Sequence, residues 1–374
     1  MRYAVIIAGG SGTRLWPMST KALPKQLIPF FQGRSLLRIA MDRLANLLPR
    51  ERIYICAGEA HREVMLENLP DLAPEQFIAE PMGRDTLNAV GLATGVLGRH
   101  DPDATVAIFT ADHIIEPVDE FARIVDRGFQ LAERSPQTLV TFGVTPTRPA
   151  TGYGYLQLGD AIDAPDAPDK SDARDARLVT QFKEKPDAAT AERYVAQGPN
   201  QYLWNSGMFV WNAQTLMDCI RRFAPENFAG LQAVLAAWDT PQRDAVLGEA
   251  YPTLPKISVD YAVMEPASRD ADVRVAAAPM ALRWLDVGSW PSFAQAQHPD
   301  DNGVVAEGCQ TVNLDSRNLT LASDDPEHLI ATIGCKDLVI IHTRRATLVC
   351  PASQAEKIKI LHARIAQELG DAYL

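Results

Sequence analysis

Short apolar runs alternate with longer amphipathic stretches over the first 145 residues of the chain. The runs are rich in β-branched residues, which predicts strands at 3–8, 52–58, 76–80, 105–111 and 138–144. Between them, apolar residues at helical spacing predict helices at 35–48, 59–69, 86–98 and 118–133. Near-continuous apolar strands separated by amphipathic helices indicate a mostly parallel sheet covered on both faces. We therefore predict a doubly wound, Rossmann-like α/β domain whose ligands lie beyond the carboxyl ends of its strands.

The pattern changes near residue 152. Two strand-like pieces at 152–158 and 178–186 flank a segment rich in Asp, Ala and Pro. This segment, 159–177, has too little apolar area to bury, so we expect a mobile loop there. Helical spacing returns at 187–197 and 213–223, and we expect mixed structure to about residue 300.

Beyond residue 302 the chain consists of short strand-like pieces separated by regular turns. They lie at 303–308, 310–315, 318–323, 328–334, 337–343 and 346–351, before an amphipathic stretch at 353–369. This texture predicts a small β appendage, solenoid-like and closed by a terminal helix, although no strict repeat is visible. We therefore expect two domains, a catalytic domain over 1–300 and the appendage over 301–374.

Composition narrows the possible partners and compartments. The 374 residues carry a net charge of −11, which offers no basic footprint for nucleic acid. The 5 cysteines are dispersed and show no Cys-x-x-Cys spacing, so a reducing, cytoplasmic location is expected rather than a disulfide framework or zinc site. The N-terminus lacks a signal-peptide pattern, and no apolar run is long enough to cross a membrane.

A glycine-rich stretch follows the first predicted strand and raises the possibility of phosphate binding. It belongs to the sequence AVIIAGGSGTRLWPMSTKALPKQ, from Ala4 to Gln26. Backbone amides can approach an anion closely where glycines leave out the Cβ atom. The stretch lacks the Gly-Lys-Ser/Thr ending of a P-loop, and Leu15 stands where the dinucleotide pattern requires its third glycine. From the glycines alone, a simple tight turn stays possible.

The wider stretch is more specific. Gly9–Leu15, followed by Trp16-Pro17 and Pro24–Gln26, resembles the signature of sugar-1-phosphate nucleotidylyltransferases, and its LWP and PKQ resemble the mannose-1-phosphate guanylyltransferase branch of that family. Further stretches match the family in order: EPMGRDT from Glu80, TADH from Thr110, TPTRPATGYGY from Thr145, FKEKP from Phe182, WNSGMF from Trp204, DYAVME from Asp260 and WLDVGSW from Trp284. The resemblance covers almost the whole chain.

The resemblance implies transfer of GMP from GTP to α-D-mannose 1-phosphate, giving GDP-mannose and pyrophosphate. It assigns catalysis to Arg14, Lys25 and Asp112, since an arginine fork and a lysine point charge suit phosphate oxygens. It places the nucleotide on Gly9, Gly10, Gly12, Thr13, Glu80 and Gly83. The nucleophile is the sugar phosphate itself, so no catalytic triad is required.

Two aspartates are the candidate metal ligands. Asp112 follows the strand predicted at 105–111, where doubly wound sheets place their chemistry, although such a residue is often only a helix cap. Asp286 precedes Val-Gly and could equally be a turn former. The resemblance assigns Mg²⁺ to both, and Mg²⁺ takes one or two carboxylates together with phosphate oxygens. His113 is expected to orient its neighbours rather than bind the metal.

The resemblance assigns the sugar phosphate to a separate group of residues: Gly152, Tyr153, Glu184, Lys185 and Asn205. In this group Glu184 and Asn205 would bind sugar hydroxyls, while Lys185 would bind the sugar's phosphate. Each has a simpler interpretation from sequence alone. The glycines beside Tyr153 could form a strand-edge bulge. Glu184 and Lys185 could be solvated charges, and the buried amide of Asn205 could hydrogen-bond to the backbone.

The chain also departs from the family pattern. Asp85 stands where the family commonly has Asn, Leu87-Asn88-Ala89 replaces Ala-Pro-Ala, and HTRRAT at 342–347 replaces DTPDA-like residues. We expect these changes to affect base contacts or the packing of the appendage. Another sugar 1-phosphate, such as a glucose or heptose phosphate, another nucleotide, or a catalytically silent homologue remains an alternative. We expect a homodimer and no phosphomannose isomerase activity, because the chain ends before such a domain.

Overall fold

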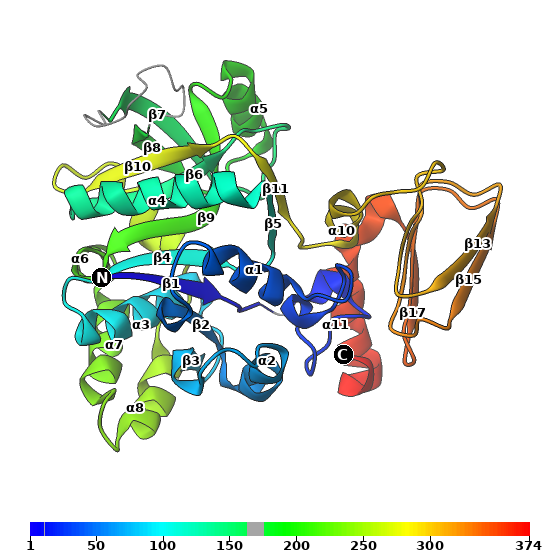
Figure 1. Ribbon diagram of the computed structural model, residues 1–374, viewed down its shortest axis with the longest axis horizontal. Helices are drawn as coiled ribbons and strands as arrows, with labels where there is room; N and C mark the ends of the chain where they lie inside the picture. The colour runs from blue at the N-terminus through cyan, green and yellow to red at the C-terminus, as the bar shows by residue number, and fades with distance from the viewer. Residues whose placement is uncertain (11, 163–175) are drawn as a thin grey trace.

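A nine-stranded sheet forms the centre of the computed structural model, which describes residues 1–10, 12–162 and 176–374 (Figure 1). Its strands are β1 (Arg2–Ile7), β2 (Ile53–Gly58), β3 (Phe77–Glu80), β4 (Thr105–Thr110), β6 (Thr138–Val144), β7 (Tyr155–Ala161), β8 (Arg177–Lys183), β9 (Tyr202–Asn212) and β10 (Arg274–Met280). They lie in the order β3-β2-β1-β4-β9-β6-β10-β8-β7. Within the described part of this sheet only β8 and β9 run against the other strands, so the predicted mostly parallel sheet is confirmed.

Helices cover both faces of the sheet. They are α1 (Leu36–Ala45), α2 (Arg62–Asn68), α3 (Asp85–His100), α4 (Val118–Arg134), α5 (Ala188–Gln197), α6 (Ala213–Phe223), α7 (Pro225–Ala237) and α8 (Arg243–Ala250). Side chains from α1, α2, α4 and α5 belong to the hydrophobic cluster on one face, and those from α3, α6, α7 and α8 to the cluster on the other. This is the doubly wound arrangement expected from the sequence.

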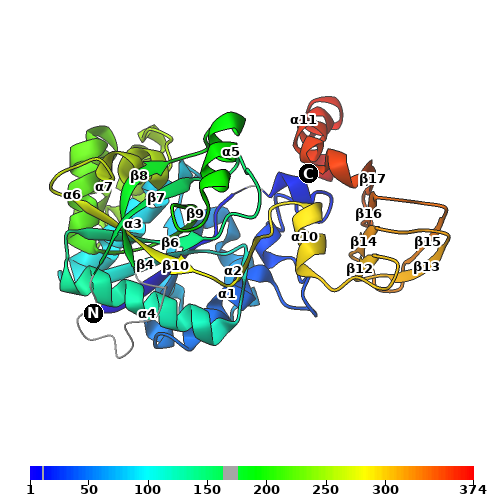
Figure 2. The same ribbon diagram turned by 90° about the horizontal axis from the view of Figure 1, so that it is seen from above.

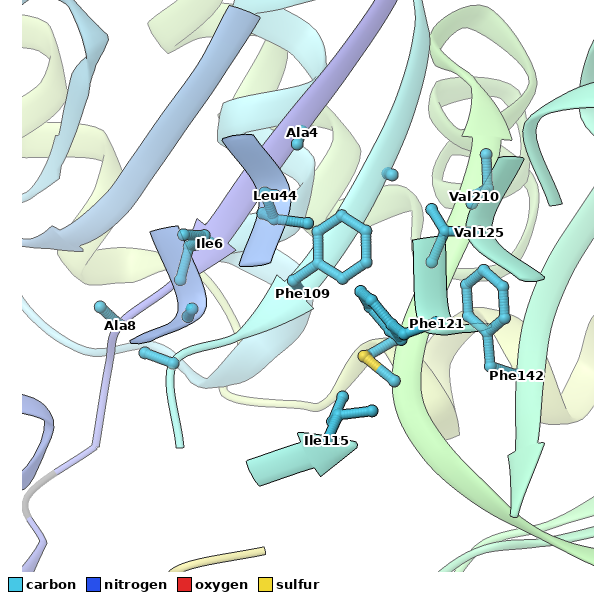
Figure 3. Close-up of a cluster of buried hydrophobic side chains, with 14 of the residues drawn as sticks. Ala4, Ile6, Ala8, Leu44, Phe109, Ile115, Phe121, Val125, Phe142 and Val210 are labelled. Carbon is cyan, nitrogen blue, oxygen red and sulfur yellow. The ribbon is translucent and has the colours of Figure 1, made fainter. Parts of the chain in front are cut away.

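The alternation of side chains along β1 explains how one strand serves both clusters. Ala4 and Ile6 pack on the face that carries α1 and α4, whereas Tyr3 and Val5 pack on the opposite face. Figure 3 shows the first of these clusters, where Phe121 of α4 lies among side chains from several strands. Both faces are buried, which explains why β1 is an uninterrupted apolar run.

A two-stranded ribbon lies apart from the central sheet. It pairs β5 (His113–Glu116) antiparallel with β11 (Arg283–Asp286), which comes from a distant part of the sequence. A π-helix, η7 (Asp260–Met264), and the short α9 (Glu265–Ala267) precede β10. Neither the ribbon nor β9 and β10 had been predicted as separate elements from the sequence.

The C-terminal part is built from stacked parallel strands. They are β12 (Val305–Glu307), β13 (Gln310–Leu314), β14 (Thr320–Ser323), β15 (Leu329–Ile333), β16 (Leu338–His342) and β17 (Thr347–Pro351). β12, β14 and β16 pair in parallel in one sheet, and β13 pairs in parallel with β15 in another. Such stacking of successive turns is solenoid-like, as predicted, while β17 closes the larger sheet by antiparallel pairing with β16.

Two helices join this appendage to the first part of the chain. They are α10 (Trp290–Ala296), which Figure 2 shows between the central sheet and the C-terminal strands, and α11 (Ile358–Leu369), preceded by the 3₁₀-helix η8 (Ala352–Lys357). One hydrophobic cluster includes Leu15 and Trp16 of the glycine-rich stretch, Trp290 of α10 and appendage residues such as Ile341. The proposed boundary at residue 300 therefore separates two parts that share a core.

Hydrogen bonds reinforce this shared core. The indole of Trp290 donates to the backbone carbonyl oxygen of Trp16 at 3.1 Å. The indole of Trp16 in turn donates to the backbone carbonyl oxygen of Tyr373 at 2.7 Å. The guanidinium of Arg345, from the divergent HTRRAT stretch, lies 5.9 Å from the ring centre of Tyr373. The appendage is thus anchored directly behind the glycine-rich stretch.

Two expectations from the sequence concern other parts of the chain. Most of the segment expected to be a mobile loop, residues 163–175, lies outside the described residues, while its ends belong to β7 and β8. Among the helices of the described residues, none combines the length and apolar character needed to cross a membrane.

Candidate active site

The glycine-rich stretch leaves β1 and is held from behind by two side chains. Gln26 donates through Nε2 to the carbonyl oxygen of Gly9 at 2.6 Å, and the hydroxyl of Ser19 donates to that of Gly12 at 2.6 Å. Gly10 has a φ of 100°, in the left-handed region that favours glycine. A loop whose carbonyl groups are bonded within the protein can turn its amide groups towards an anion.

Two features favour glycine at position 12: the positive φ of its backbone and the close approach of Lys25. The φ of Gly12 is 58°, and a Cβ atom there would lie 2.8 Å from the Cβ atom of Lys25. Lys25 opens the 3₁₀-helix η2 (Lys25–Leu27), so the second half of the motif folds back onto the first. The glycine therefore allows the lysine to approach the loop, and the preceding 3₁₀-helix, η1 (Thr13–Leu15), starts with Thr13 and carries Arg14.

Lys25 and Asp112 form the central ion pair of the site. The ammonium Nζ lies 2.6 Å from Oδ2 of Asp112, and their side chains are only 12% and 21% exposed. Burial tends to raise the pKa of Asp112, but the charge and hydrogen bond of Lys25, together with His113 and a hydrogen bond from Thr110, outweigh burial and hold that pKa well below its usual range. Burial likewise tends to lower the pKa of Lys25, yet Asp112 and Asp286 raise it. Both groups are charged at neutral pH.

Asp286 joins this pair through the β5–β11 ribbon. It lies opposite His113 in the antiparallel register, and the amide of the next residue, Val287, donates to the carbonyl oxygen of Asp112 at 2.9 Å. Burial, followed by the charge of Asp112, raises the pKa of Asp286 to about 6. One ligand atom from each of Asp112, His113 and Asp286 lies within 4.8 Å of the others. Two carboxylates this close suit a hard divalent cation.

The hydrogen bonds of His113 support an orienting role. Its Nδ1 accepts from the indole of Trp284 at 3.2 Å and lies 2.8 Å from the hydroxyl of Thr110. Burial lowers the pKa of His113 to about 4, so the ring is neutral, and with Nδ1 accepting, the proton is assigned to Nε2. Nε2 faces Asp112 at 3.8 Å. The ring is therefore held through Nδ1, while Nε2 lies towards Asp112 beyond hydrogen-bond distance.

Arg14 contacts a residue that the sequence did not single out. Its Nε lies 2.9 Å from Oε2 of Glu356 in η8, and the two side chains are 46% and 73% exposed. A Cβ atom at Gly288 would lie 3.8 Å from Nη1 of Arg14 and 3.4 Å from Oδ1 of Asp286, which places the arginine beside the candidate metal ligands. The appendage thus supplies a carboxylate to Arg14, one of the residues predicted to bind phosphate.

The residues predicted for the nucleotide base lie at the end of β3. Glu80 is buried, and its Oε1 accepts a short hydrogen bond from the hydroxyl of Tyr251. Burial raises the pKa of Glu80 to about 7. A Cβ atom at Gly83 would meet nothing within 4 Å, so this glycine borders open space. Direct contact of Glu80 with the nucleotide stays a prediction.

The two nearby departures from the family pattern have structural explanations. Asp85 has a φ of 64°, a left-handed conformation that Asn and Asp both tolerate, and its carboxylate accepts from the amide of Thr86 at 2.8 Å. Asn88 is fully buried: it donates to the carbonyl oxygen of Pro255 at 2.9 Å and accepts from Asn227 at 2.9 Å. Asn88 therefore links α3 to neighbouring segments.

Three aromatic rings border the predicted sugar end. The ring of Tyr153 lies 5.1 Å from that of Trp204 and 5.4 Å from that of Trp284, both in edge arrangements. The guanidinium of Arg148 lies 5.9 Å from the ring centres of Tyr153 and Trp204. A Cβ atom at Gly152 would meet nothing within 4 Å. The glycines and Tyr153 thus lie between the ribbon and β9, next to the candidate metal ligands.

Glu184, Lys185 and Asn205 lie together behind Gly154. The ammonium of Lys185 is 2.8 Å from Oε1 of Glu184, and the backbone amide of Asn205 donates to the carbonyl oxygen of Gly154 at 2.8 Å. The side-chain amide of Asn205 accepts from Thr141 and donates to Asp260. The structure therefore brings the three predicted residues together, although the partners of the Asn205 amide come from the protein.

Sequence reasoning missed several residues that shape the site. Asp260 belongs to the quoted DYAVME stretch and Trp284 to WLDVGSW, so a motif was present but no role was assigned. Arg43 donates to the carbonyl oxygen of His113 at 2.8 Å from within α1. Arg43 lies in an ordinary amphipathic helix, so its sequence context did not indicate a contact with the site. The sequence context of Glu356 did not indicate one either.

The fold and the site together define the class of protein. A glycine-rich loop after β1, a lysine–aspartate pair at the end of β4 and a mostly parallel sheet are the parts expected of a nucleotidyltransferase. A family model described as "Nucleotidyl transferase" matches residues 3–302, and the chain belongs to this family. A second model, described as "MannoseP isomerase/GMP-like beta-helix domain", matches residues 309–364.

Individual relatives narrow this class and confirm the predicted resemblance. Over 362 residues the chain is 37% identical to a mannose-1-phosphate guanylyltransferase of Klebsiella pneumoniae and 36% identical to one of Escherichia coli, covering 96% of this chain and 73% of each relative. The crystal structure named mannose-1-phosphate geranyltransferase, from Thermus thermophilus, superimposes with a TM-score of 0.82 at 31% identity, covering 97% of this chain and 99% of that one.

Proposed function

We propose that this protein transfers GMP from GTP to α-D-mannose 1-phosphate, giving GDP-mannose and pyrophosphate. The observation that carries the proposal is the Lys25–Asp112 pair, placed beside Asp286 at the carboxyl end of β4. It offers a positive charge for phosphate oxygens next to two carboxylates suited to a cation. The similarity to mannose-1-phosphate guanylyltransferases over 96% of the chain supports the choice of substrates.

The transfer requires positioning and charge neutralisation rather than a protein nucleophile. An oxygen of the sugar phosphate attacks the α-phosphorus of GTP in line, and pyrophosphate leaves on the opposite side. The loop over Gly9, Gly10, Gly12 and Thr13 would bind the triphosphate through its amides. Arg14 and Lys25 would stabilise the charge that develops on the departing pyrophosphate. Glu80 and Gly83 are proposed to lie on the base side.

The candidate cation is Mg²⁺, held by Asp112 and Asp286. The low pKa of Asp112 means that this carboxylate is ionised and ready to bind a cation at neutral pH. When bound, the ion would offset the repulsion between two anionic substrates. His113, whose Nδ1 accepts from the indole of Trp284, would orient the strand end.

The sugar end would hold mannose 1-phosphate. We assign the sugar hydroxyls to Glu184 and Asn205 and the phosphate to Lys185, with Gly152 and Tyr153 closing the pocket. Glu184 is buried at 6% exposure, which suits a carboxylate that hydrogen-bonds a ligand inside a pocket.

We also propose that the protein is a homodimer. Outward-facing residues of β13 and β15 form an exposed apolar face, which includes Val312, Leu314, Leu329 and Ile333. Exposed apolar faces of this kind commonly mark contact surfaces. The five cysteines are free thiols, which fits the proposed cytoplasmic location.

Pyrophosphate release tests the proposed function directly. The protein is incubated with Mg²⁺ and each combination of GTP, ATP or dTTP with mannose, glucose or heptose phosphates. We expect GTP with mannose 1-phosphate to give the highest kcat/KM. Faster turnover with ATP or dTTP would remove the guanylyl assignment and leave the reaction class, whereas no turnover with any pair would indicate a catalytically silent homologue.

A further inference from the structure

Asp260 occupies a rigid position next to the sugar end. It is the first residue of the π-helix η7, and such single-turn insertions are frequent at functional sites. The segment before it is fixed on α3: the amide of Val259 donates to the hydroxyl of Thr86 at 3.0 Å, and the amide of Leu87 donates to the carbonyl oxygen of Ile257 at 3.2 Å. The carboxylate is therefore presented from a fixed backbone.

A chain of hydrogen bonds then orients this carboxylate. The hydroxyl of Thr141 donates to Oδ1 of Asn205 at 2.8 Å, and Nδ2 of Asn205 donates to Oδ1 of Asp260 at 2.8 Å. The amide of Asn205 is thus used at both ends by protein groups. Besides its proposed contact with a sugar hydroxyl, Asn205 therefore holds Asp260, and it engages only one of the two carboxylate oxygens.

A second carboxylate near Asp260, that of Glu184, has an oxygen without a donor. Within residues 1–10, 12–162 and 176–374, no group donates to Oε2 of Glu184, although this atom is buried. A Cβ atom at Gly154 would lie 2.5 Å from it, so only glycine leaves the place beside the oxygen free. A buried carboxylate oxygen normally has a partner, and a ligand hydroxyl would supply one.

Asp260 and Glu184 are close enough for the charge of Glu184 to affect the ionisation of Asp260. Burial, followed by the charge of Glu184, raises the pKa of Asp260 to about 7, while Lys185 opposes this shift. A protonated Asp260 offers one donor as well as an acceptor, and the oxygens of Glu184 offer further acceptors. Neighbouring sugar hydroxyls require this combination, because each hydroxyl both donates and accepts.

We propose that Asp260 is a specificity-determining residue of the sugar subsite, where its carboxylate acts beside that of Glu184 to hydrogen-bond hydroxyls of the sugar 1-phosphate. This inference rests on the proposed function, because it takes the hexose of mannose 1-phosphate as the ligand. A site built to bond a hydroxyl discriminates strongly against an analogue that leaves its buried groups unpaired. Asp260 would therefore help to distinguish mannose from its epimers.

Binding of GDP-sugars to the full chain tests the inference. Calorimetry would measure the affinities of GDP-mannose, GDP-glucose and GDP for the wild type and two variants. Asp260→Asn keeps the shape of the side chain and an acceptor for Asn205. Asp272→Asn is the control, because the side chain of Asp272 is 78% exposed. We expect Asp260→Asn to weaken GDP-mannose binding about 10- to 100-fold and to narrow the preference over GDP-glucose. GDP binding, which also reports folding, should be unchanged.

The outcomes separate the inference from the proposed function. Equal GDP-mannose affinity in the wild type and Asp260→Asn, or an equal loss of GDP affinity, would overturn the role of Asp260. A second variant, Asp260→Ser, should show the same selective loss if the first folds poorly. Absence of turnover in the wild type would overturn the proposed function, but the ratio of GDP-mannose to GDP affinity decides the role of Asp260 in either case.

Discussion

The predicted phosphate end and the predicted sugar end of this site differ in how their charged groups are satisfied. At the phosphate end, Lys25 is paired with Asp112 and Arg14 with Glu356, while Asp286 lies beside Asp112. At the sugar end, Lys185 pairs with Oε1 of Glu184, but Oε2 of Glu184 has no donor among the described residues.

This difference reflects what each end would bind. Phosphate oxygens would meet the charges of Lys25 and Arg14, and a cation held by Asp112 and Asp286 would balance the negative charge of that carboxylate pair. Sugar hydroxyls carry no charge and are distinguished by direction, which buried acceptors with unmet hydrogen bonds can detect. Charge therefore governs one end, and hydrogen-bond geometry governs the other.

The largest test of the comparison is Lys25→Ala. It removes the cation of the central pair and leaves Asp112 uncompensated, so we expect kcat/KM to fall about 10²- to 10³-fold. Pyrophosphate release with GTP and mannose 1-phosphate measures this. Lys359→Ala, which removes an exposed lysine of α11, should be near normal, and near-normal rates for Lys25→Ala would refute its role.

The corresponding test at the sugar end is Gly154→Ala. Its Cβ atom would lie 2.5 Å from Oε2 of Glu184 and 3.3 Å from the Cβ atom of Asn205, so the carboxylate must move. We expect the KM for mannose 1-phosphate to rise on the order of tenfold to a hundredfold, with a much smaller change in the KM for GTP. Gly248→Ala, where a Cβ atom meets nothing within 4 Å, is the control. Equal changes in both KM values would contradict the separation of the two ends.

Asp286→Asn tests whether the phosphate end depends on a cation. Loss of one of two carboxylate ligands should raise the Mg²⁺ concentration for half-maximal activity by about tenfold. A metal titration at saturating substrates measures this, with the exposed Asp301→Asn as control. An unchanged titration would remove Asp286 from the proposed ligands.

The pH dependence of the free energy of unfolding tests the ionisation of Asp260 at the sugar end. The pKa of Asp260 is raised to about 7, so between about pH 4 and 7 the folded state holds a proton that the unfolded state has lost. Its contribution to the free energy of unfolding therefore declines as pH rises through that window. The charge of Glu184 raises the pKa of Asp260, and the charge of Lys185 opposes this shift. Tyr261 is a further titratable group, and it acts on Lys185.

Asp260→Asn should remove this dependence. Relative to the wild type, it should gain on the order of 1 to 2 kcal/mol in the free energy of unfolding between pH 5 and pH 8. Guanidinium denaturation at several pH values would measure both proteins. Parallel pH profiles would show that Asp260 does not titrate in this window.

The smallest expected effect comes from Glu356→Gln. Because the Arg14–Glu356 pair is exposed, it contributes only about 0 to 1 kcal/mol to stability, so the melting temperature should hardly change. Freeing Arg14 should lower the KM for GTP by up to about fivefold. Glu368→Gln, which breaks an exposed pair with Arg364, is the matched control. A higher KM for GTP would show that Glu356 assists binding.

Much of the fold was predictable because its signals are local. The periodicity of α4 and the continuous apolar runs of β1 and β4 depend on neighbouring residues, and the structure confirms each of them. β9 was missed because its pairing with strands on both sides is long-range. The β5–β11 ribbon was missed for the same reason, since its two strands come from segments far apart in the sequence.

The candidate site shows the same division. The motifs located Arg14, Lys25, Asp112, Glu184 and Asn205, which the structure places at the two ends described. They carried no sign that the amide of Asn205 holds Asp260, because that contact spans 55 residues and depends on a third residue, Thr141. Nor could they show that a glutamate of the appendage reaches Arg14, near the opposite end of the chain.

The sequence by itself determined the doubly wound fold, the solenoid-like appendage and the chemical types of the candidate site residues. Periodicity, glycine-rich turns and motifs depend only on residues that are close together in the chain. The resemblance of the sequence to a known family also predicts that Lys25, in the stretch from Gly9 to Gln26, binds phosphate. Only the tertiary structure decided which charges pair, which carboxylates lie near each other and which oxygen is left without a donor among the described residues. These properties depend on burial and on distances between segments far apart in the chain, and no local pattern records them.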